Sequence, residues 1–189
     1  EVVLAGVRDT GVALEWASQD LQSDLEIARA AVGASAEALQ FAGEAPRSDR
    51  KIVLQAVEED GLLLALALGE ARLDRQVALA AVLQNGQALQ FVADELRGDR
   101  EVVLAALSQS TSMELIKYAA EELRRDRDVV LAAVRKNGSA LRYAGKEMQR
   151  DREIVLAAVE ECGSHGLTEA APEWQQDGEL QRLAALIDH

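Results

Sequence analysis

The chain has too few residues of several types to support whole classes of protein chemistry. It has one cysteine, Cys162, and therefore cannot form an internal disulfide. Its two histidines, His165 and His189, leave few ligands for a transition metal. Tryptophan, tyrosine and phenylalanine occur twice each, so aromatic platforms for stacking bases or sugars are scarce. These shortages argue against a disulfide scaffold and against most enzyme classes.

Long apolar runs and an excess of positive charge are also missing. The longest apolar run extends from Leu62 to Leu68 and is far shorter than the ~20 residues that cross a bilayer, so we expect no membrane span. The net charge of −13 disfavours nonspecific binding to nucleic acid or anionic lipid. Because the sequence opens inside a structural pattern, without a Met or a signal peptide, we expect a segment of a longer or processed chain. Its compartment stays open between cytoplasm and organelle.

A pattern of about 25 residues repeats along the chain. Residues 99–107 read DREVVLAAL, and the pattern returns as DRDVVLAAV at 126–134 and as DREIVLAAV at 151–159. Looser copies begin at Asp24, Asp49 and Asp74, and the chain opens within another. Repeats therefore start near residues 1, 24, 49, 74, 99, 126 and 151, followed by a degenerate cap over residues 164–189. This self-similarity predicts a single repeat array over residues 1–189.

Each repeat is expected to form two α-helices of ~11 residues, too short to be stable alone. The leading Asp suits the N-cap of the first helix, because its carboxylate accepts hydrogen bonds from free N–H groups. Glycines follow the first helix at positions 11, 61, 86, 138 and 163, where a left-handed residue would end it. We predict an all-α solenoid of about seven ~25-residue helical hairpins with a C-terminal capping helix, its curvature and handedness left open.

Five of the six aromatic residues occupy one equivalent position in the predicted second helix. They are Trp16, Phe41, Phe91, Tyr118 and Tyr143, with Leu66 in the third repeat. One interpretation is a stacking groove on the surface. The interpretation favoured here is a buried column of the core, because a repeat array aligns equivalent side chains in rows.

A consensus for these repeats reads D-R-E-[IV]-V-L-A-A-V-x-x-N-G-x-A-L-x-[FY]-A-x-x-x-[LM]-x-x-D. It resembles the family known as domain of unknown function 4116, best over residues 74–97 and 126–150 and more loosely from residue 1 to about 163. The family occurs in tandem arrays in protists, unicellular algae and some bacteria. The resemblance implies an all-helical repeat protein, suggests a eukaryotic microbe as its source and supplies no activity, cofactor or site residue.

Motifs for catalysis are weak. Cys162 and His165 have the spacing C-x-x-H, but a zinc site needs further ligands and a nucleophile pair needs an orienting group. The recurring Asp-Arg-Glu is interpreted as helix caps and ion pairs between repeats, because it returns along the array, either unchanged or with one residue changed. No glycine-rich phosphate loop occurs. We therefore expect no enzyme, no cofactor and no metal.

Departures from the repeat pattern supply the candidate partner contacts. Residues 124–152 hold nine Lys or Arg against four Asp or Glu, which makes this segment basic in an acidic chain. The basic candidates are Arg124, Arg127, Arg135, Lys136, Arg142 and Lys146. In the third repeat, Leu62 and Leu68 replace small or polar residues of the sister repeats. Arg29 occupies a position that is leucine in the other repeats and is expected to extend into solvent or to meet an acidic partner.

The function expected from this sequence is a noncatalytic protein–protein interaction or scaffold module. One alternative is an accessory structural subunit of a large complex, including an organellar or photosynthetic one. A second alternative is a nucleic-acid-binding helical array that uses the basic segment, although the overall charge makes nucleic acid the weaker partner. The partner and the oligomeric state are not encoded in a recognisable motif.

Overall fold

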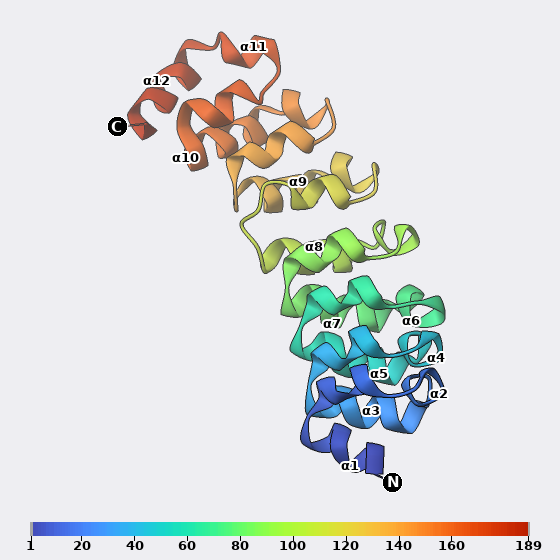
Figure 1. Cartoon of the computed structure of the whole chain (residues 1–189). Coiled ribbons are helices and arrows are strands. Elements are labelled where there is room, and N and C mark those ends of the chain that lie inside the picture. Colours follow the sequence, from blue (N-terminus) through green and yellow to red (C-terminus); the bar gives the residue numbers. More distant parts are fainter. Residues whose placement is uncertain (1, 189) are drawn as a thin grey trace. The chain divides into compact units, whose positions relative to one another are not determined.

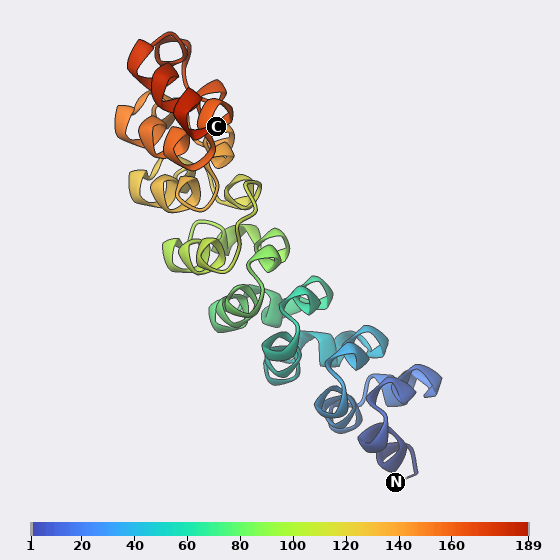
Figure 2. The same cartoon turned by 90° about the vertical axis from the view of Figure 1, so that its left-hand side faces the viewer.

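The computed structural model describes residues 2–188, which form helices joined by turns and contain no strand (Figure 1). Contacts between residues divide the chain into two compact units, residues 1–96 and 97–189. Within each unit, helices of successive repeats lie side by side (Figures 1 and 2). The all-α repeat fold expected from the sequence is confirmed in both units, while the single array over residues 1–189 stays a prediction.

A repeat consists of an α-helix, a six-residue or shorter 3₁₀ helix and a short third helical segment. In the first unit these elements are α1 (Val2–Asp9), η1 (Gly11–Trp16), α2 (Gln19–Gln22), α3 (Leu25–Ala34), η2 (Ala36–Phe41), α4 (Glu44–Ser48), α5 (Arg50–Glu59), η3 (Gly61–Leu66), α6 (Gly69–Leu73), α7 (Arg75–Gln84), η4 (Gly86–Phe91) and η5 (Asp94–Leu96). In the second unit they are α8 (Arg100–Ser108), η6 (Leu115–Tyr118), η7 (Leu123–Arg125), α9 (Arg127–Val134), η8 (Gly138–Tyr143), η9 (Met148–Arg150), α10 (Arg152–Thr168), α11 (Pro172–Gln175) and α12 (Gly178–Ile187).

The first helix of each repeat begins as the sequence predicts. Asp49 is the N-cap of α5, and its carboxylate accepts hydrogen bonds from the N–H groups of Lys51 and Ile52 at 2.9 and 3.0 Å. The same cap occurs at Asp24, Asp74, Asp99, Asp126, Asp151 and Asp177. A carboxylate at this end also interacts favourably with the helix dipole. The predicted capping role of the repeated Asp is therefore confirmed.

The second half of the repeat differs from the predicted α-helix of ~11 residues. It is a 3₁₀ helix that stops at an extended residue, such as Ala67 after η3, before a short third segment begins. The next N–H group then donates to the preceding repeat: Leu68 N–H to the carbonyl of Arg47 at 2.8 Å, and Gly145 N–H to that of Arg124 at 2.8 Å. The chain leaves the helix because this hydrogen bond between repeats needs an extended backbone.

The glycines after the first helices also act differently from the prediction. Of the five glycines predicted to end a first helix, all of them within the described residues, only Gly163 has a positive φ, +55°. Its backbone conformation interrupts α10. At Gly11, Gly61 and Gly138, a Cβ atom would lie 2.2–2.4 Å from a backbone carbonyl of the next repeat. These glycines allow close approach of neighbouring repeats rather than a left-handed turn. The second repeat has Ala36 here, so one interface accommodates a methyl group.

The core column is built from aliphatic residues, and the prediction of a buried aromatic column is wrong. The buried residue lies two positions before each aromatic and before Leu66 of the third repeat. These buried residues are at most 1% exposed: Leu14, Leu39, Leu64, Leu89, Ile116 and Leu141. Trp16 is 85% exposed, and Phe41, Phe91, Tyr118 and Tyr143 are half-buried. A 3₁₀ helix has three residues per turn, so a shift of two positions turns the aromatic toward the edge of the repeat.

Ion pairs join successive repeats, as the repeated Asp-Arg-Glu predicts. Arg100 contacts Asp126 at 3.6 Å and Asp128 at 2.8 Å. Arg127 in turn contacts Asp151 at 3.2 Å and also Glu153. In the first unit Arg50 contacts Asp74 at 2.7 Å. The arginine at the start of each of these first helices thus contacts the cap aspartate of the next repeat.

These contacts lower the pKa of two of the cap residues, Asp74 and Asp151. Burial by itself would raise the pKa of Asp151, but hydrogen bonds from the Ile154 N–H, the Arg127 guanidinium and the Glu153 N–H outweigh it and lower the pKa below its ordinary value. Asp74 has a lowered pKa for equivalent reasons. Hydrogen bonds to Asp151 and Glu153 raise the pKa of Arg127. Asp74, Asp151 and Arg127 are therefore charged at neutral pH.

The helix α12 closes the second unit as the predicted C-terminal capping helix. It packs on α10 and repeats the pattern of a first helix, with Asp177 as its N-cap. Gly178 stands where α8, α9 and α10 have the ion-pairing arginine, and exposed Gln181 stands where α10 has the buried Val155. A polar residue in place of the buried valine is typical of a capping repeat, and α12 also exposes Leu186 and Ile187.

Candidate functional site

The first helices of the second unit place leucines at one equivalent position, five residues after each N-cap aspartate. They are Leu104 of α8, Leu131 of α9 and Leu156 of α10. Neighbouring valines and isoleucines take the fully buried positions, so these leucines lie at the edge of the core. Leu131 is buried, and the other two are half-buried. We call this row and the cavities beside it the leucine face.

Three surface cavities follow one another along the leucine face. The first has a volume of about 260 Å³ and is lined by Leu104, Leu107, Ser108, Ala132, Arg135 and Lys136. The second, of about 420 Å³, is lined by Leu131, Arg135, Glu153, Leu156, Ala157, Glu160 and Glu161. The third, of about 280 Å³, is lined by Arg152, Leu156, Glu179, Leu180, Arg182, Leu183 and Leu186. Because consecutive cavities share Arg135 and then Leu156, they form one interrupted groove.

Charges of opposite sign border the first and the second cavity of this groove. Arg135 and Lys136 border the first cavity, whereas Glu160 and Glu161 border the second. Within the described residues Arg135 forms no ion pair, and Lys136 donates a hydrogen bond only to the carbonyl of Ser108, at 3.2 Å. A groove that is lined by leucines and has unpaired basic groups at one end can hold an apolar segment whose acidic side chain faces that end.

The corresponding face of the first unit is interrupted by Arg29. Leu4, Leu54 and Leu79 are half-buried at the equivalent position, whereas Arg29 on α3 is exposed. Its guanidinium forms no ion pair within the described residues. Arg29 therefore extends into solvent, which is one of the two alternatives that the sequence predicts, and it shows that this position tolerates an arginine.

The structure distributes the six basic candidates over several places. Arg135 and Lys136 lie on the leucine face. Arg127 belongs to the ion-pair ladder, and Arg142 lies 5.8 Å from the ring centre of Tyr143 and 3.6 Å from the carboxylate of Glu169. The remaining two, Arg124 and Lys146, line a separate cavity on the turn segments.

Leu62 and Leu68 do not share a helix. Leu62 lies in the first turn of η3 and is 37% exposed. Leu68 lies beyond the end of η3, where it is the half-buried N-cap of α6 and its N–H donates to Arg47. Between them Leu64 is fully buried, and Leu63 and Leu66 pack against the core. Most of this apolar run therefore serves packing, and the surface excess is concentrated at Leu62.

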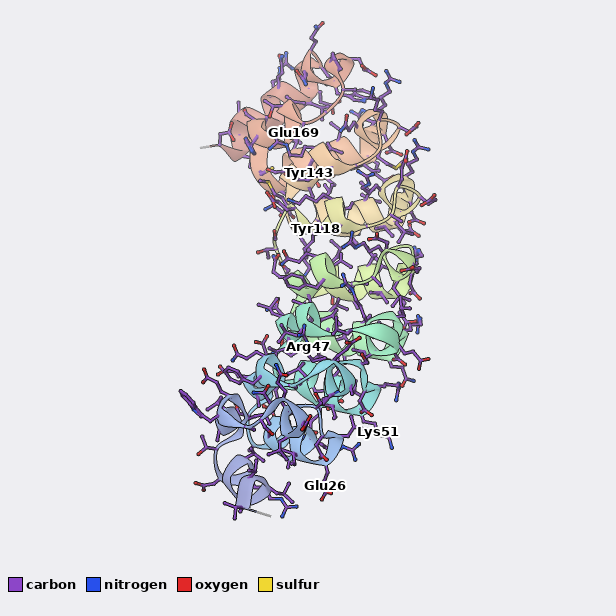
Figure 3. The ribbon with its side chains drawn as sticks, turned by 45° about the vertical axis from the view of Figure 1, so that its right-hand side comes forward. Glu26, Arg47, Lys51, Tyr118, Tyr143 and Glu169 are labelled. Carbon is purple, nitrogen blue, oxygen red and sulfur yellow. The ribbon has the colours of Figure 1, made fainter. Side chains whose placement is uncertain are left out.

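A second surface carries two of the five aromatic residues that the sequence places at one equivalent position. Figure 3 shows Tyr118, Tyr143 and Glu169 on one side of the second unit, at equivalent positions of successive repeats. Lys117 lies 5.0 Å from the ring centre of Tyr118, and its hydrogen bond to Glu114 raises its pKa. The signal that could have identified this surface is the basic residue directly before each tyrosine, at Lys117 and Arg142.

The Cys162 side chain takes part in local packing. Its thiol contacts the carbonyl of Ala158 at 3.4 Å and the hydroxyl of Ser139 at 3.9 Å. His165 is exposed, three residues further along the chain. Within residues 2–188, no three His, Cys, Asp or Glu side chains form a group that could hold a metal ion. In the same part of the chain, no helix is long and apolar enough to cross a membrane.

Paired helices, cap aspartates and ion-pair ladders at a fixed period define this chain as a helical repeat protein. A family model described as "Domain of unknown function (DUF4116)" matches it three times, over residues 74–124, 114–149 and 126–175. These matches cover more than half of the chain, which therefore belongs to this family. The chain matches no curated protein and no solved structure.

Proposed function

We propose that the chain is a noncatalytic interaction module that binds an apolar segment of a partner protein along the leucine face. The observation that carries this proposal is the run of three consecutive cavities beside Leu104, Leu131 and Leu156. Repeat proteins use extended faces of this kind for binding, because equivalent side chains of successive repeats form continuous rows. The same surface would serve the alternative role, an accessory subunit held in a large complex.

Charge complementarity specifies the partner segment further. Arg135 and Lys136 at one end of the groove favour an acidic residue, and Glu160 and Glu161 favour a basic residue further along. The segment would therefore present apolar side chains between an acidic and a basic residue. Such a charge pattern sets direction and specificity, while burial of the apolar side chains supplies most of the affinity.

Nucleic acid is the weaker candidate for the partner. Within residues 124–152, acidic side chains of the protein itself contact Arg125, Arg127, Arg142, Arg150 and Arg152. Ion pairs of this kind reduce the net positive potential that a phosphate backbone requires. The basic segment therefore supports a protein partner better than a nucleic acid.

The substitution Leu156→Arg tests the proposal, because Leu156 borders two of the three cavities. The protein itself has arginine at the equivalent positions Arg29 and Arg182, so the variant is expected to fold. We expect loss of the partner in affinity purification from source cells, with stability lowered by no more than about 1.5 kcal/mol. The control, Leu73→Arg, changes a leucine that is exposed and outside the groove and should retain the partner. Equal recovery by both variants would contradict the proposal.

A further inference from the structure

A cavity separate from the leucine face contains an unpaired arginine. It has a volume of about 410 Å³, lies between the turn segments of two neighbouring repeats and is lined by Glu121, Arg124, Arg125, Tyr143, Ala144, Gly145, Lys146 and Glu147. It shares no lining residue with the three cavities of the leucine face. We call it the Arg124 cavity.

The Nε atom of Arg124 is buried and has no hydrogen-bond partner among the described residues. A buried donor without an acceptor destabilises the fold, because the group has lost water and gained nothing in return. At the equivalent position Arg47 donates from Nε to the carbonyl of Leu66 at 2.7 Å. Gln22 and Gln149 likewise donate to carbonyls of their repeats, at 3.1 and 3.2 Å. Arg124 therefore lacks the structural hydrogen bond that Arg47, Gln22 and Gln149 form at the equivalent position.

The charges around the cavity favour one anionic group. Arg125 contacts Glu121 at 2.5 Å and Glu147 at 4.0 Å, so both lining carboxylates are engaged with a single guanidinium. Arg124 and Lys146 form no ion pair within the described residues. The formal charge of the lining is therefore +1. A single carboxylate neutralises this charge, whereas a phosphate dianion would exceed it and be repelled by the two glutamates.

The cavity also provides room for the atoms that carry a carboxylate. Tyr143 is half-buried and lines one side, and Ala144 and Gly145 follow it in the sequence. The Gly145 N–H is already bonded to the carbonyl of Arg124, so the available donors come from side chains. From these observations we infer that the Arg124 cavity binds the carboxylate of a partner protein, with Arg124 and Lys146 as the ion-pairing groups. The carboxylate is that of an Asp or Glu residue or of a polypeptide C-terminus.

The inference is tested by NMR titration of the protein. The readouts are the Arg124 Nε–H signal and, for all variants, the backbone N–H signals of Ala144 and Gly145, which line the cavity. The probes are acetyl-Ala-Glu-Ala-amide, which has a glutamate carboxylate, and acetyl-Ala-Ala-Ala, which has a terminal one. Acetyl-Ala-Gln-Ala-amide is the neutral control, at equal ionic strength. We expect a saturable shift with one or both acidic peptides and none with the neutral peptide, and the stronger binder identifies the source of the carboxylate. Absence of a saturable shift with both acidic peptides would overturn the inference.

Two variants and a control sharpen the test. Arg124→Gln copies Gln22 and Gln149, which the same position already accepts, so it should fold and lose affinity for the acidic peptide at least tenfold. Lys146→Gln should weaken binding of the acidic peptide several-fold. If Arg124→Gln does not fold, the affinity of the Lys146→Gln variant tests the inference in its place. Arg47→Gln removes an arginine outside the cavity and should leave the titration unchanged. If the variants at Arg124 and Lys146 bind the acidic peptide with unchanged affinity, the carboxylate binds elsewhere and the inference is overturned. This outcome does not depend on whether Leu156→Arg loses the partner of the leucine face.

Discussion

The stability of the array should depend on burial rather than on side-chain size, and three truncations to alanine separate the two. Leu89 is fully buried in η4, Phe91 is half-buried two residues later, and Trp16 is 85% exposed at the equivalent position of the first repeat. Truncation of a fully buried leucine removes its transfer free energy and leaves a cavity, at a cost of about 3–5 kcal/mol. For Phe91→Ala we expect about 1–2 kcal/mol, because solvent already reaches part of the ring. For Trp16→Ala we expect less than about 0.5 kcal/mol.

The measurement is urea unfolding followed by far-ultraviolet circular dichroism, with all three variants in the same unit of the protein. The expected order of destabilisation is Leu89→Ala, then Phe91→Ala, then Trp16→Ala, which is the reverse of side-chain size. If the free energy of unfolding falls with urea concentration at the same slope in all three variants, the variants unfold to comparable states. If the cost instead follows size, with tryptophan the most expensive, the aliphatic column is not the core and the reasoning about the 3₁₀ register is refuted.

Three further perturbations test other parts of the structure. Gly61→Ala should destabilise the protein by about 1–3 kcal/mol, because the new Cβ would lie 2.2 Å from a backbone carbonyl. Gly178→Ala, with open space around the new Cβ, should stabilise it by about 0.5–1 kcal/mol. Thermal melts should therefore show a lower melting temperature for the first variant and a higher one for the second, and a change in the same direction for both would contradict the close approach at Gly61. Asp151→Asn should lower the free energy of unfolding at pH 7. The difference from the native protein should shrink as pH falls through the lowered pKa of Asp151, because the charged carboxylate stabilises the fold only above that pKa. A difference in the free energy of unfolding that is constant between pH 7 and pH 2 would refute this. The double change Leu62→Gln with Leu68→Ser should leave the free energy of unfolding nearly unchanged, because Leu68 is an N-cap and serine is a good residue at that position. It should weaken any association of the protein through this segment, measured by sedimentation. A loss of about 3 kcal/mol in the free energy of unfolding would assign both leucines to the core.

The periodic part of the sequence predicts much of this fold. The spacing of the cap aspartates identifies the repeats, and the same residues cap the first helices in the structure. The Asp-Arg-Glu pattern predicts the ion pairs between repeats because it recurs along the array. These features depend on local chemistry and on a repeat distance, and both can be taken from the order of residues alone.

The second half of the repeat could not be predicted in the same way. Its residues have helical preferences, yet Ala67 is extended because Leu68 donates its N–H to the preceding repeat. A contact between repeats therefore decides the local backbone. The resulting 3₁₀ register moves Phe91 to the edge and Leu89 into the core, and residue type alone favours the opposite order.

The candidate sites were predictable only in part. Sequence reasoning found Arg135, Lys136, Arg124 and Lys146 as part of one basic segment. It could not divide them between two surfaces, because that division depends on which basic residues are paired inside the array. The leucine face escaped notice as a surface because leucine recurs at this position in all repeats but the second, and a recurring apolar residue normally indicates the core.

Crosslinking mass spectrometry in source cells tests the central claim, that a partner protein occupies the leucine face, most directly. Lys136 borders the first cavity of that face, whereas Lys51, which is exposed on α5, lies outside all three cavities and provides an internal control. With an amine-reactive crosslinker, we predict that links to one partner protein concentrate at Lys136, end on a segment of apolar residues flanked by opposite charges, and disappear in the Leu156→Arg variant. Links distributed equally between Lys136 and Lys51, or links at Lys136 that persist in that variant, would contradict the account.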